Sequence, residues 1–141
     1  MMKSSMTLTT AGKSLYLKLG IKEGDSVYLY NAPDHYQQIL GMLPPGVMFL
    51  PEACWGEDLV HIFITSAAEL TEQLTLHLAL IKQDGTIWVS WPKKSARIPS
   101  EVNDHLVRSI ALPMGLVDNK ICAIDDVWTA IKLVIRLENR K

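Results

Sequence analysis

The stretch Asp58–Pro92, DLVHIFITSAAELTEQLTLHLALIKQDGTIWVSWP, decides the fold of this chain. Residues Leu59 to Ile64 form an apolar run that only His61 interrupts, and Thr86 to Trp91 form a second run of β-branched and aromatic residues. Short apolar runs of this kind, bounded by turn residues, are typical of buried strands. The stretch therefore predicts a strand, a connecting segment and a second strand.

The connecting segment has the features of a helix. Ser66 followed by Glu69 is a capping box, in which each side chain satisfies a free backbone N–H group at the start of a helix. One face of the predicted helix follows at helical spacing, formed by Leu70, Leu74, His77, Leu78 and Ile81. The pair Asp84-Gly85 then supplies a turn, in which we expect Gly85 to take the left-handed conformation that ends many helices.

Neither strand alternates cleanly between polar and apolar residues, so we expect both faces of the sheet to be covered and the strands to be parallel. A chain of 141 residues is long enough for one domain with its own core. We expect residues 1–10 to be a flexible N-terminus and residues 11–141 to be a single domain. The net charge of −1 argues against a protein that binds nucleic acid mainly through its overall charge.

The other elements are predicted from local patterns. They are a helix in residues 11–19 ending at Gly20, a strand at 26–30, a helix at 33–40, a strand at 47–50, a helix at 101–112 and strands at 116–124 and 128–137. Only residues 125–127, which include the turn residues Asp125-Asp126, connect the last two strands; this is too short for a parallel crossover, so they form a hairpin. The fold class is α/β, with a mostly parallel Rossmann-like sheet, helices on both faces and a C-terminal antiparallel hairpin.

This order of elements resembles a trimmed methyltransferase-type Rossmann sheet, whose last two strands also form a hairpin. The strand with Val60, the helix after Ser66 and the string IKQDGTIWVS resemble the middle of that fold. The resemblance supports this architecture but not S-adenosylmethionine binding, because the second βα unit is shortened and two further features depart from the pattern. The loop after the first strand, Asn31-Ala32-Pro33-Asp34, contains no glycine, and no acidic residue stands at the end of the second strand. The cofactor is therefore left unassigned.

Residues Leu19 to Leu137 also resemble a family of bacterial domains of unknown function. The strings that carry this resemblance are LGIKEGDSVYLYNAPDHY, DLVHIFITSAAEL, DGTIWVSWPKKS and GLVDNKICAIDDVWTAIKLVIR. The WVSWPKKS string and the loop that begins with NAP are the most specific of them. This resemblance implies a fold and no particular reaction.

In an open parallel sheet, ligands bind beyond the carboxyl ends of the strands. Loops from three predicted strands end there, and helix N-termini, lysines and a tryptophan would give that edge N–H donors, positive charge and a stacking face. We therefore expect an anion or nucleotide site formed by Asn31, Asp34, His35, Thr65, Ser66, Trp91, Lys93, Lys94 and Ser95. The alternative is that Ser66 only caps a helix, Trp91 fills the edge of the core and the lysines are solvated.

Signals for catalysis or metal binding are weak. The histidines His35, His61, His77 and His105 lack the spacing of metal ligands, and we expect His61 and His77 to be packed inside the protein. His35 is the one candidate for acid–base chemistry. Cys54 has no base near it in sequence and Cys122 falls in a strand, so neither is expected to be catalytic.

Localisation and partners follow from what the sequence lacks. No apolar run approaches ~18 residues, which argues against a membrane span. The first residues lack the apolar core of a secretory signal, so we expect a cytoplasmic protein. The basic loop Lys93–Arg97 carries three positive charges, which are few for nucleic-acid binding.

Three functions remain open. The leading hypothesis is a non-catalytic module that binds a small molecule or anion, or has a regulatory role. An alternative is an enzyme that acts on a small anionic substrate and depends on S-adenosylmethionine. A further alternative is an interaction domain that dimerises, or docks on another protein, through its C-terminal hairpin.

Overall fold

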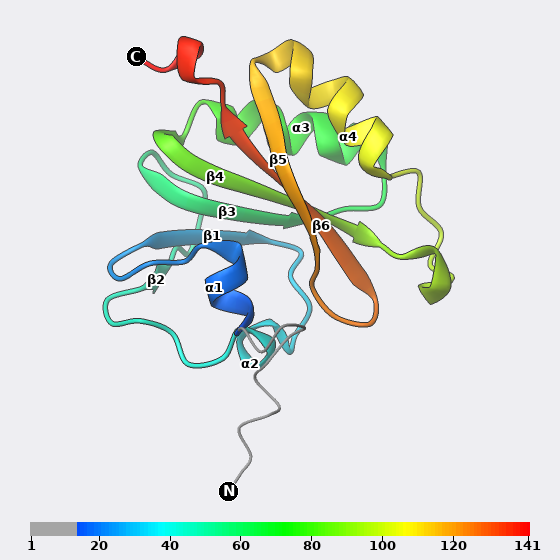
Figure 1. The fold of residues 1–141 in the computed structure, drawn as a ribbon, viewed down its shortest axis with the longest axis horizontal. Helices are drawn as coiled ribbons and strands as arrows, with labels where there is room; N and C mark the ends of the chain where they lie inside the picture. Colours follow the sequence, from blue (N-terminus) through cyan, green and yellow to red (C-terminus); the bar gives the residue numbers. More distant parts are fainter. Residues whose placement is uncertain (1–13) are drawn as a thin grey trace, which may run out of the picture.

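Six strands form one sheet in the computed structural model, which describes residues 14–141 (Figure 1). The strands are β1 (Ser26–Tyr30), β2 (Met48–Phe49), β3 (Glu57–Phe63), β4 (Ile81–Pro92), β5 (Leu116–Ala123) and β6 (Trp128–Ile135). Their order is β2-β1-β3-β4-β6-β5, with β2, β1, β3 and β4 parallel and β6 antiparallel to both of its neighbours. The predicted fold class is confirmed. The flexible N-terminus expected at residues 1–10 lies outside the described residues.

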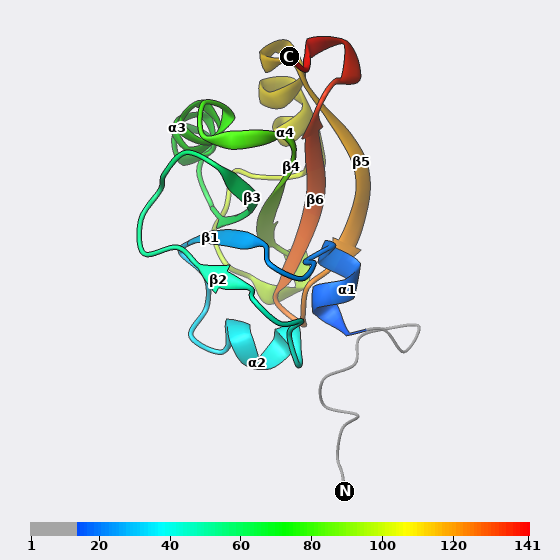
Figure 2. The same cartoon turned by 90° about the vertical axis from the view of Figure 1, so that its left-hand side faces the viewer.

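Helices cover both faces of the sheet (Figure 2). The helices α1 (Leu15–Leu19) and α2 (Tyr36–Leu40) lie on one face, called the α1 face below. The helices α3 (Ala67–Leu78) and α4 (Asp104–Ala111) lie on the other, the α3 face. Short 3₁₀ turns are η3 (Lys94–Ala96), η4 (Leu112–Met114) and η5 (Leu137–Asn139). Among the described residues no helix has the length and apolar character needed to cross a membrane.

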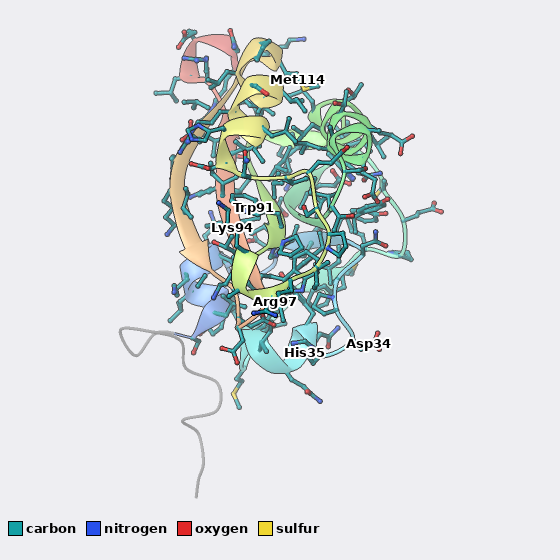
Figure 3. The ribbon with its side chains drawn as sticks, turned by 90° about the vertical axis from the view of Figure 1, so that its right-hand side faces the viewer. Asp34, His35, Trp91, Lys94, Arg97 and Met114 are labelled. Atoms are coloured by element: carbon teal, nitrogen blue, oxygen red, sulfur yellow. The ribbon has the colours of Figure 1, made fainter. Side chains whose placement is uncertain are left out.

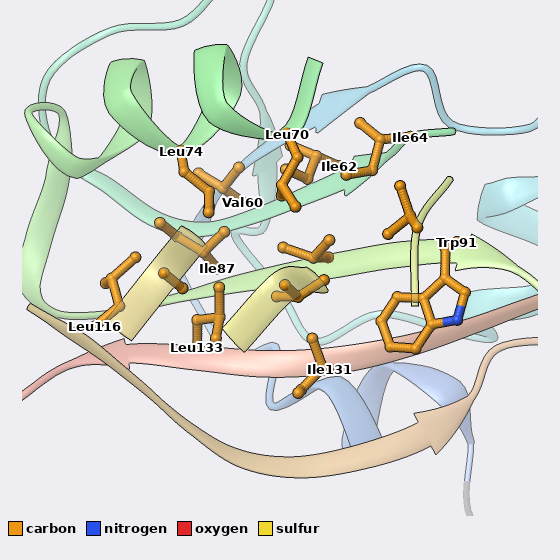
Figure 4. Packing of buried hydrophobic residues seen from close by; sticks show 14 of the residues in the cluster. Val60, Ile62, Ile64, Leu70, Leu74, Ile87, Trp91, Leu116, Ile131 and Leu133 are labelled. Atoms are coloured by element: carbon orange, nitrogen blue, oxygen red, sulfur yellow. The ribbon is translucent and has the colours of Figure 1, made fainter. Parts of the chain in front are cut away.

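Two apolar layers hold these helices on the sheet. On the α3 face, side chains from β3, β4 and β6 meet those of α3, and Figure 4 shows them interdigitating. On the α1 face, the fully buried Trp88 lies in a second layer with Leu15, Leu19 and Tyr36. The indole N–H of Trp88 donates to the carbonyl oxygen of Leu19 at 2.8 Å, which fastens the end of α1 to the middle of the sheet.

The predicted start of α3 is confirmed, but its predicted end is wrong. The hydroxyl of Ser66 accepts a hydrogen bond from the Glu69 N–H at 3.1 Å, as a capping box requires. The helix ends at Leu78, and Ile81 is already the first residue of β4. The helical spacing of buried residues extends to Ile81 because this residue is buried in β4, as it would be in a longer helix.

Gly85 does not take the predicted left-handed conformation, because it lies inside β4 and has no positive φ. Glu57 of β3 pairs with Ile81, whereas Leu59, two positions later, pairs with Thr86, so residues 82–85 bulge out of the strand. A Cβ atom on Gly85 would lie 2.5 Å from Ile81 Cγ1 and 3.0 Å from the carbonyl oxygen of Asp58. Close packing, not backbone conformation, is therefore the reason for glycine here.

We expect Gly85→Ala to lower the free energy of unfolding by about 1–3 kcal/mol, because the buried Ile81 side chain cannot move aside without strain. Urea denaturation measures this change. Gly20→Ala is a useful comparison, since a Cβ atom there would meet nothing within 4 Å and the cost comes from the positive φ of 84° alone. A stability of Gly85→Ala equal to that of the wild type would contradict the close packing.

Candidate ligand site at the carboxyl edge of the sheet

Strands β1, β3 and β4 all end at one edge of the sheet, called the carboxyl edge below (Figure 3). From β1 the chain passes through α2, on the α1 face, to β2; from β3 it passes through α3, on the opposite face, to β4. The two connections therefore leave in opposite directions, and the carboxyl ends of β1 and β3 flank a topological switch point. Ligands of open α/β sheets bind at such points.

The loop after β1 turns without glycine. Asn31 has a φ of 57°, so its backbone is in the left-handed region. Glycine takes this conformation most readily, and asparagine tolerates it better than most other residues because its short side chain forms local hydrogen bonds. The missing glycine therefore does not prevent a sharp turn at the end of β1, and the side chain of Asn31 is exposed there.

The N-terminus of α3, expected to bind an anion, is already occupied by carboxylates of the chain. The N–H of Ala67 donates to Glu101 Oε1 at 2.7 Å, and the N–H of Glu101 donates to the Thr65 carbonyl at 2.9 Å. Glu69 accepts a hydrogen bond from the Tyr30 hydroxyl at 3.0 Å, and burial together with this bond raises the pKa of Tyr30. These carboxylates would repel a phosphate and attract a cation.

His35 and Asp125 join two of the loops at this edge. His35 Nε2 lies 3.0 Å from Asp125 Oδ2, and the His35 side chain is 50% exposed. The other oxygen of Asp125 accepts the N–H groups of Val127 and Trp128, which confirms the predicted role of Asp125 in the turn. Burial opposes ionisation of Asp125, but the hydrogen bonds from Trp128, His35 and Val127 outweigh it and lower the pKa of this carboxyl.

The other candidates divide between the core and the solvent. Trp91 is 8% exposed and belongs to the α3-face core, so little of its ring is free to stack on a ligand. Lys93 has its backbone N–H bound to the Val127 carbonyl at 2.7 Å. Lys94 and Ser95 lie in η3 and are exposed, as is Asp34 after β1. The nine predicted residues thus share one edge, but Trp91, Thr65 and Ser66 have structural roles there.

Two interactions at this edge were missed from the sequence. Glu101 caps a helix that begins 34 residues earlier in the chain, and no local pattern connects the two. Glu69 was expected only as part of the capping box, whereas it also holds Tyr30. Both residues are acidic, so they place negative charge where the sequence predicted a site for an anion.

His61 and His77 are packed inside the protein, as predicted. His61 Nδ1 lies 2.7 Å from the Tyr36 hydroxyl and its Nε2 lies 2.6 Å from the Ser90 hydroxyl. Burial lowers the pKa of His61 to about 3. His77 Nδ1 donates to the buried carboxylate of Glu57 at 2.8 Å. Within residues 14–141, no group of three potential ligands could hold a metal ion.

A small polar cavity of about 40 Å³ lies at the opposite, amino edge of the sheet, lined in part by Lys22, Asp25, Asp58 and Thr86. It has room for water but not for a nucleoside. The cavity at the amino edge is therefore not a candidate site for a ligand of that size.

The strand order, the C-terminal hairpin and the switch point between β1 and β3 define a class of fold. It is a Rossmann-like α/β domain with the topology of methyltransferases. No family model matches the chain, and no curated protein matches it in sequence. The resemblance to a family of bacterial domains therefore stays a prediction.

Solved structures with the same fold include S-adenosylmethionine-dependent methyltransferases. One from Aquifex aeolicus has a TM-score of 0.60 at 14% identity over 84% of this chain and 87% of its own. A Sulfolobus solfataricus protein described as a type 11 methyltransferase has a TM-score of 0.64 at 11% identity, over 90% of this chain and 92% of its own. Fibrillarin from Aeropyrum pernix, solved with natively bound S-adenosyl-L-methionine, has a TM-score of 0.54 at 16% identity, over 85% of this chain and 73% of its own. At these sequence identities, the structural similarity shows the fold alone.

Proposed function

We propose that this chain is a methyltransferase-like domain that binds S-adenosylmethionine at the carboxyl edge, between the ends of β1 and β3. The observation that carries the proposal is the switch point at β1 and β3 in a fold that matches most of both chains in the comparisons. Ligands of such sheets bind at the switch point, and the topology therefore supports this position for the site. This proposal develops the enzyme alternative from the sequence in preference to the anion-binding module.

The residues at this edge fit parts of the ligand. Asn31 gives the backbone turn that allows close approach after β1. Strand β2 ends at Phe49, and the Leu50 N–H still donates to the Val27 carbonyl at 2.8 Å, so Glu52 follows the last paired residue closely. In dinucleotide-binding sheets an acidic residue about 20 positions after the first strand binds the ribose hydroxyls. Glu52, exposed and with no side-chain partner among residues 14–141, would have this role, which replaces the expectation that no acidic residue stands at the end of the second strand.

The charge of the edge supports the same ligand. S-adenosylmethionine carries a sulfonium and an ammonium group, which are cations, and one carboxylate, so its cationic groups outnumber its anionic group. The carboxylates of Glu69 and Glu101 at the N-terminus of α3 favour such groups and disfavour a phosphate at the same place. A ligand with cationic groups therefore fits this edge better than the simple anion that the sequence suggested.

Methyl transfer is the second candidate, and the pair His35–Asp125 favours it. Asp125 accepts from Nε2 of His35, which leaves Nδ1 as the basic nitrogen of a half-exposed imidazole. A carboxylate that orients a histidine in this way is common to general bases. S-adenosylmethionine supplies an electrophilic methyl group when bound, and His35 Nδ1 would take the proton that the methyl acceptor loses.

We expect S-adenosylmethionine to bind the wild-type chain in a calorimetric titration, and Glu52→Gln to weaken binding by about tenfold or more, because a hydrogen bond to a charged group is lost. Glu23→Gln is the matched control: it removes the same charge from an exposed residue before β1, at the amino edge, and should leave the affinity unchanged. Equal losses in both variants, or no binding to the wild type, would contradict the proposal. ATP and inorganic phosphate serve as comparison ligands.

The catalytic candidate needs a separate experiment. The chain is incubated with methyl-labelled S-adenosylmethionine and a small-molecule extract, and labelled products are counted. His35→Gln should bind the labelled compound as the wild type does and form no labelled product. Binding without product in the wild type would leave the domain a binding module and refute methyl transfer to the small molecules of the extract.

A further inference from the structure

A row of side chains on the α1 face places two lysines together in the middle of the sheet. Trp88 of β4 pairs in register with Lys132 of β6, and Lys132 pairs with Lys120 of β5. Residues paired on neighbouring strands point to the same face. Because Trp88 belongs to the α1-face core, both lysines also lie on that face. Lys120 Nζ is 6.0 Å from the centre of the Trp88 ring, so its side chain reaches along the row toward Lys132.

Within the described part of the chain, no acidic side chain forms an ion pair with either lysine. Like charges directly opposite each other on an antiparallel pair destabilise the sheet. Among residues 14–141, the ion pairs use other basic groups, namely those of His35, His77, Lys82 and Arg108. The side chains of Lys120 and Lys132 have no hydrogen-bond or ion-pair partner within that part of the chain.

Further lysines add to the positive field on this face. Partial burial, and then the charges of Lys120 and Lys22, lower the pKa of Lys132. Cys122 lies beside Lys120 on β5; burial raises the pKa of its thiol, while the charges of Lys18 and Lys120 oppose the increase. Four lysines thus act on one area of a chain whose net charge is −1.

We propose that Lys120 and Lys132 form the base of a binding site for a small phosphate-bearing ligand on the α1 face. Directly opposite residues have their Cβ atoms roughly 5 Å apart, which lets both ammonium groups converge on one phosphate. A few cations balance a phosphate or pyrophosphate group, whereas binding along a nucleic-acid chain requires the neutralisation of many phosphates. The positive charge of these lysines therefore fits a small phosphate-bearing ligand better than a nucleic-acid chain.

This site is separate from the carboxyl edge. Trp88 precedes Pro92, the end of β4, by four positions, which corresponds to ~13 Å along a strand. The proposal goes beyond S-adenosylmethionine binding, and each can fail without the other.

The test is a calorimetric titration of the full chain with sodium pyrophosphate at low ionic strength. The double variant Lys120→Gln/Lys132→Gln should bind at least about tenfold more weakly than the wild type. The double variant Arg97→Gln/Lys141→Gln removes the same charge from two exposed residues outside both proposed sites and should bind as the wild type does. Because the first variant removes a repulsion, its melting temperature should equal or exceed that of the wild type, so weaker binding does not come from unfolding.

Three results would overturn the proposal. The first is the absence of saturable binding of pyrophosphate to the wild type at millimolar concentration. The second is an equal loss of affinity in both double variants, which would indicate a general effect of net charge. The third is tighter binding of a single-stranded oligonucleotide than of pyrophosphate, which would assign the face to nucleic acid. S-adenosylmethionine should bind Lys120→Gln/Lys132→Gln with unchanged affinity.

Discussion

Replacing His77 with leucine is expected to lower the free energy of unfolding by about 3–5 kcal/mol, because the substitution leaves a carboxylate buried without its partner. His77 and Glu57 are both fully buried, and the Nδ1 nitrogen lies 2.8 and 3.0 Å from the two carboxylate oxygens. The pair joins the last turn of α3 to the start of β3. A loss of this size is a large share of the stability of a typical domain, so a urea titration detects it easily.

The double variant Glu57→Leu/His77→Leu is the control for this mechanism. Buried ion pairs can often be replaced by apolar residues at little cost, since both charges are then removed from the interior. His77 Nε2 and Gln73 Oε1 are also buried and have no hydrogen-bond partner within residues 14–141, which makes an apolar replacement still less costly. The double variant should therefore be more stable than His77→Leu alone. A double variant at least as unstable as His77→Leu would show that packing, not the buried charge, sets the cost.

The second large effect is a loss of stability in acid that comes from His61. The pKa of folded His61 is about 3, lowered from 6.5 by complete burial. As the pH falls below about 6.5 the unfolded chain takes up a proton at this residue and the folded chain does not. The contribution of His61 to stability is therefore complete above pH 6.5 and is lost progressively as the pH falls toward 3. The expected loss is roughly 1.4 kcal/mol per pH unit.

The measurement is urea unfolding of the wild type and His61→Gln between about pH 7 and 4.5. Over this range the ordinary carboxyl groups contribute little, because their pKa values lie near 4. Glutamine can still bond to the hydroxyls of Tyr36 and Ser90, but it does not titrate. The variant should therefore lose less stability than the wild type as the pH falls. Parallel pH profiles for the two proteins would contradict the assignment to His61.

The sequence predicted the elements whose signals are local. Strand β1 has the predicted bounds, Ser26–Tyr30, because apolar and aromatic residues there are flanked by a polar turn and a proline loop. Ser66 caps α3 as expected, and the short connection at Asp125 forces the hairpin. The end of α3 was missed because the bulge at residues 82–85 depends on pairing with β3, which no local pattern reports.

The sequence predicted which loops meet at the carboxyl edge, but not the charge that they carry there. The order of the strands brings Asn31, Thr65 and the loop after Pro92 to one edge, as expected from parallel topology. Its charge could not be predicted, because Glu101 reaches the N-terminus of α3 across 34 positions in the chain. The left-handed turn at Asn31 was within reach of sequence reasoning, since asparagine is the residue after glycine that most often takes it.

Binding of S-adenosylmethionine at the carboxyl edge can be followed residue by residue in an NMR titration of the uniformly ¹⁵N-labelled chain. We expect saturable shifts of the backbone amides of Asn31, Thr65 and Ser66 and of the loop around Glu52, with little change at the amino edge near Asp25 and Asp58. Shifts confined to other regions, or no shifts at millimolar S-adenosylmethionine, would contradict the proposed site.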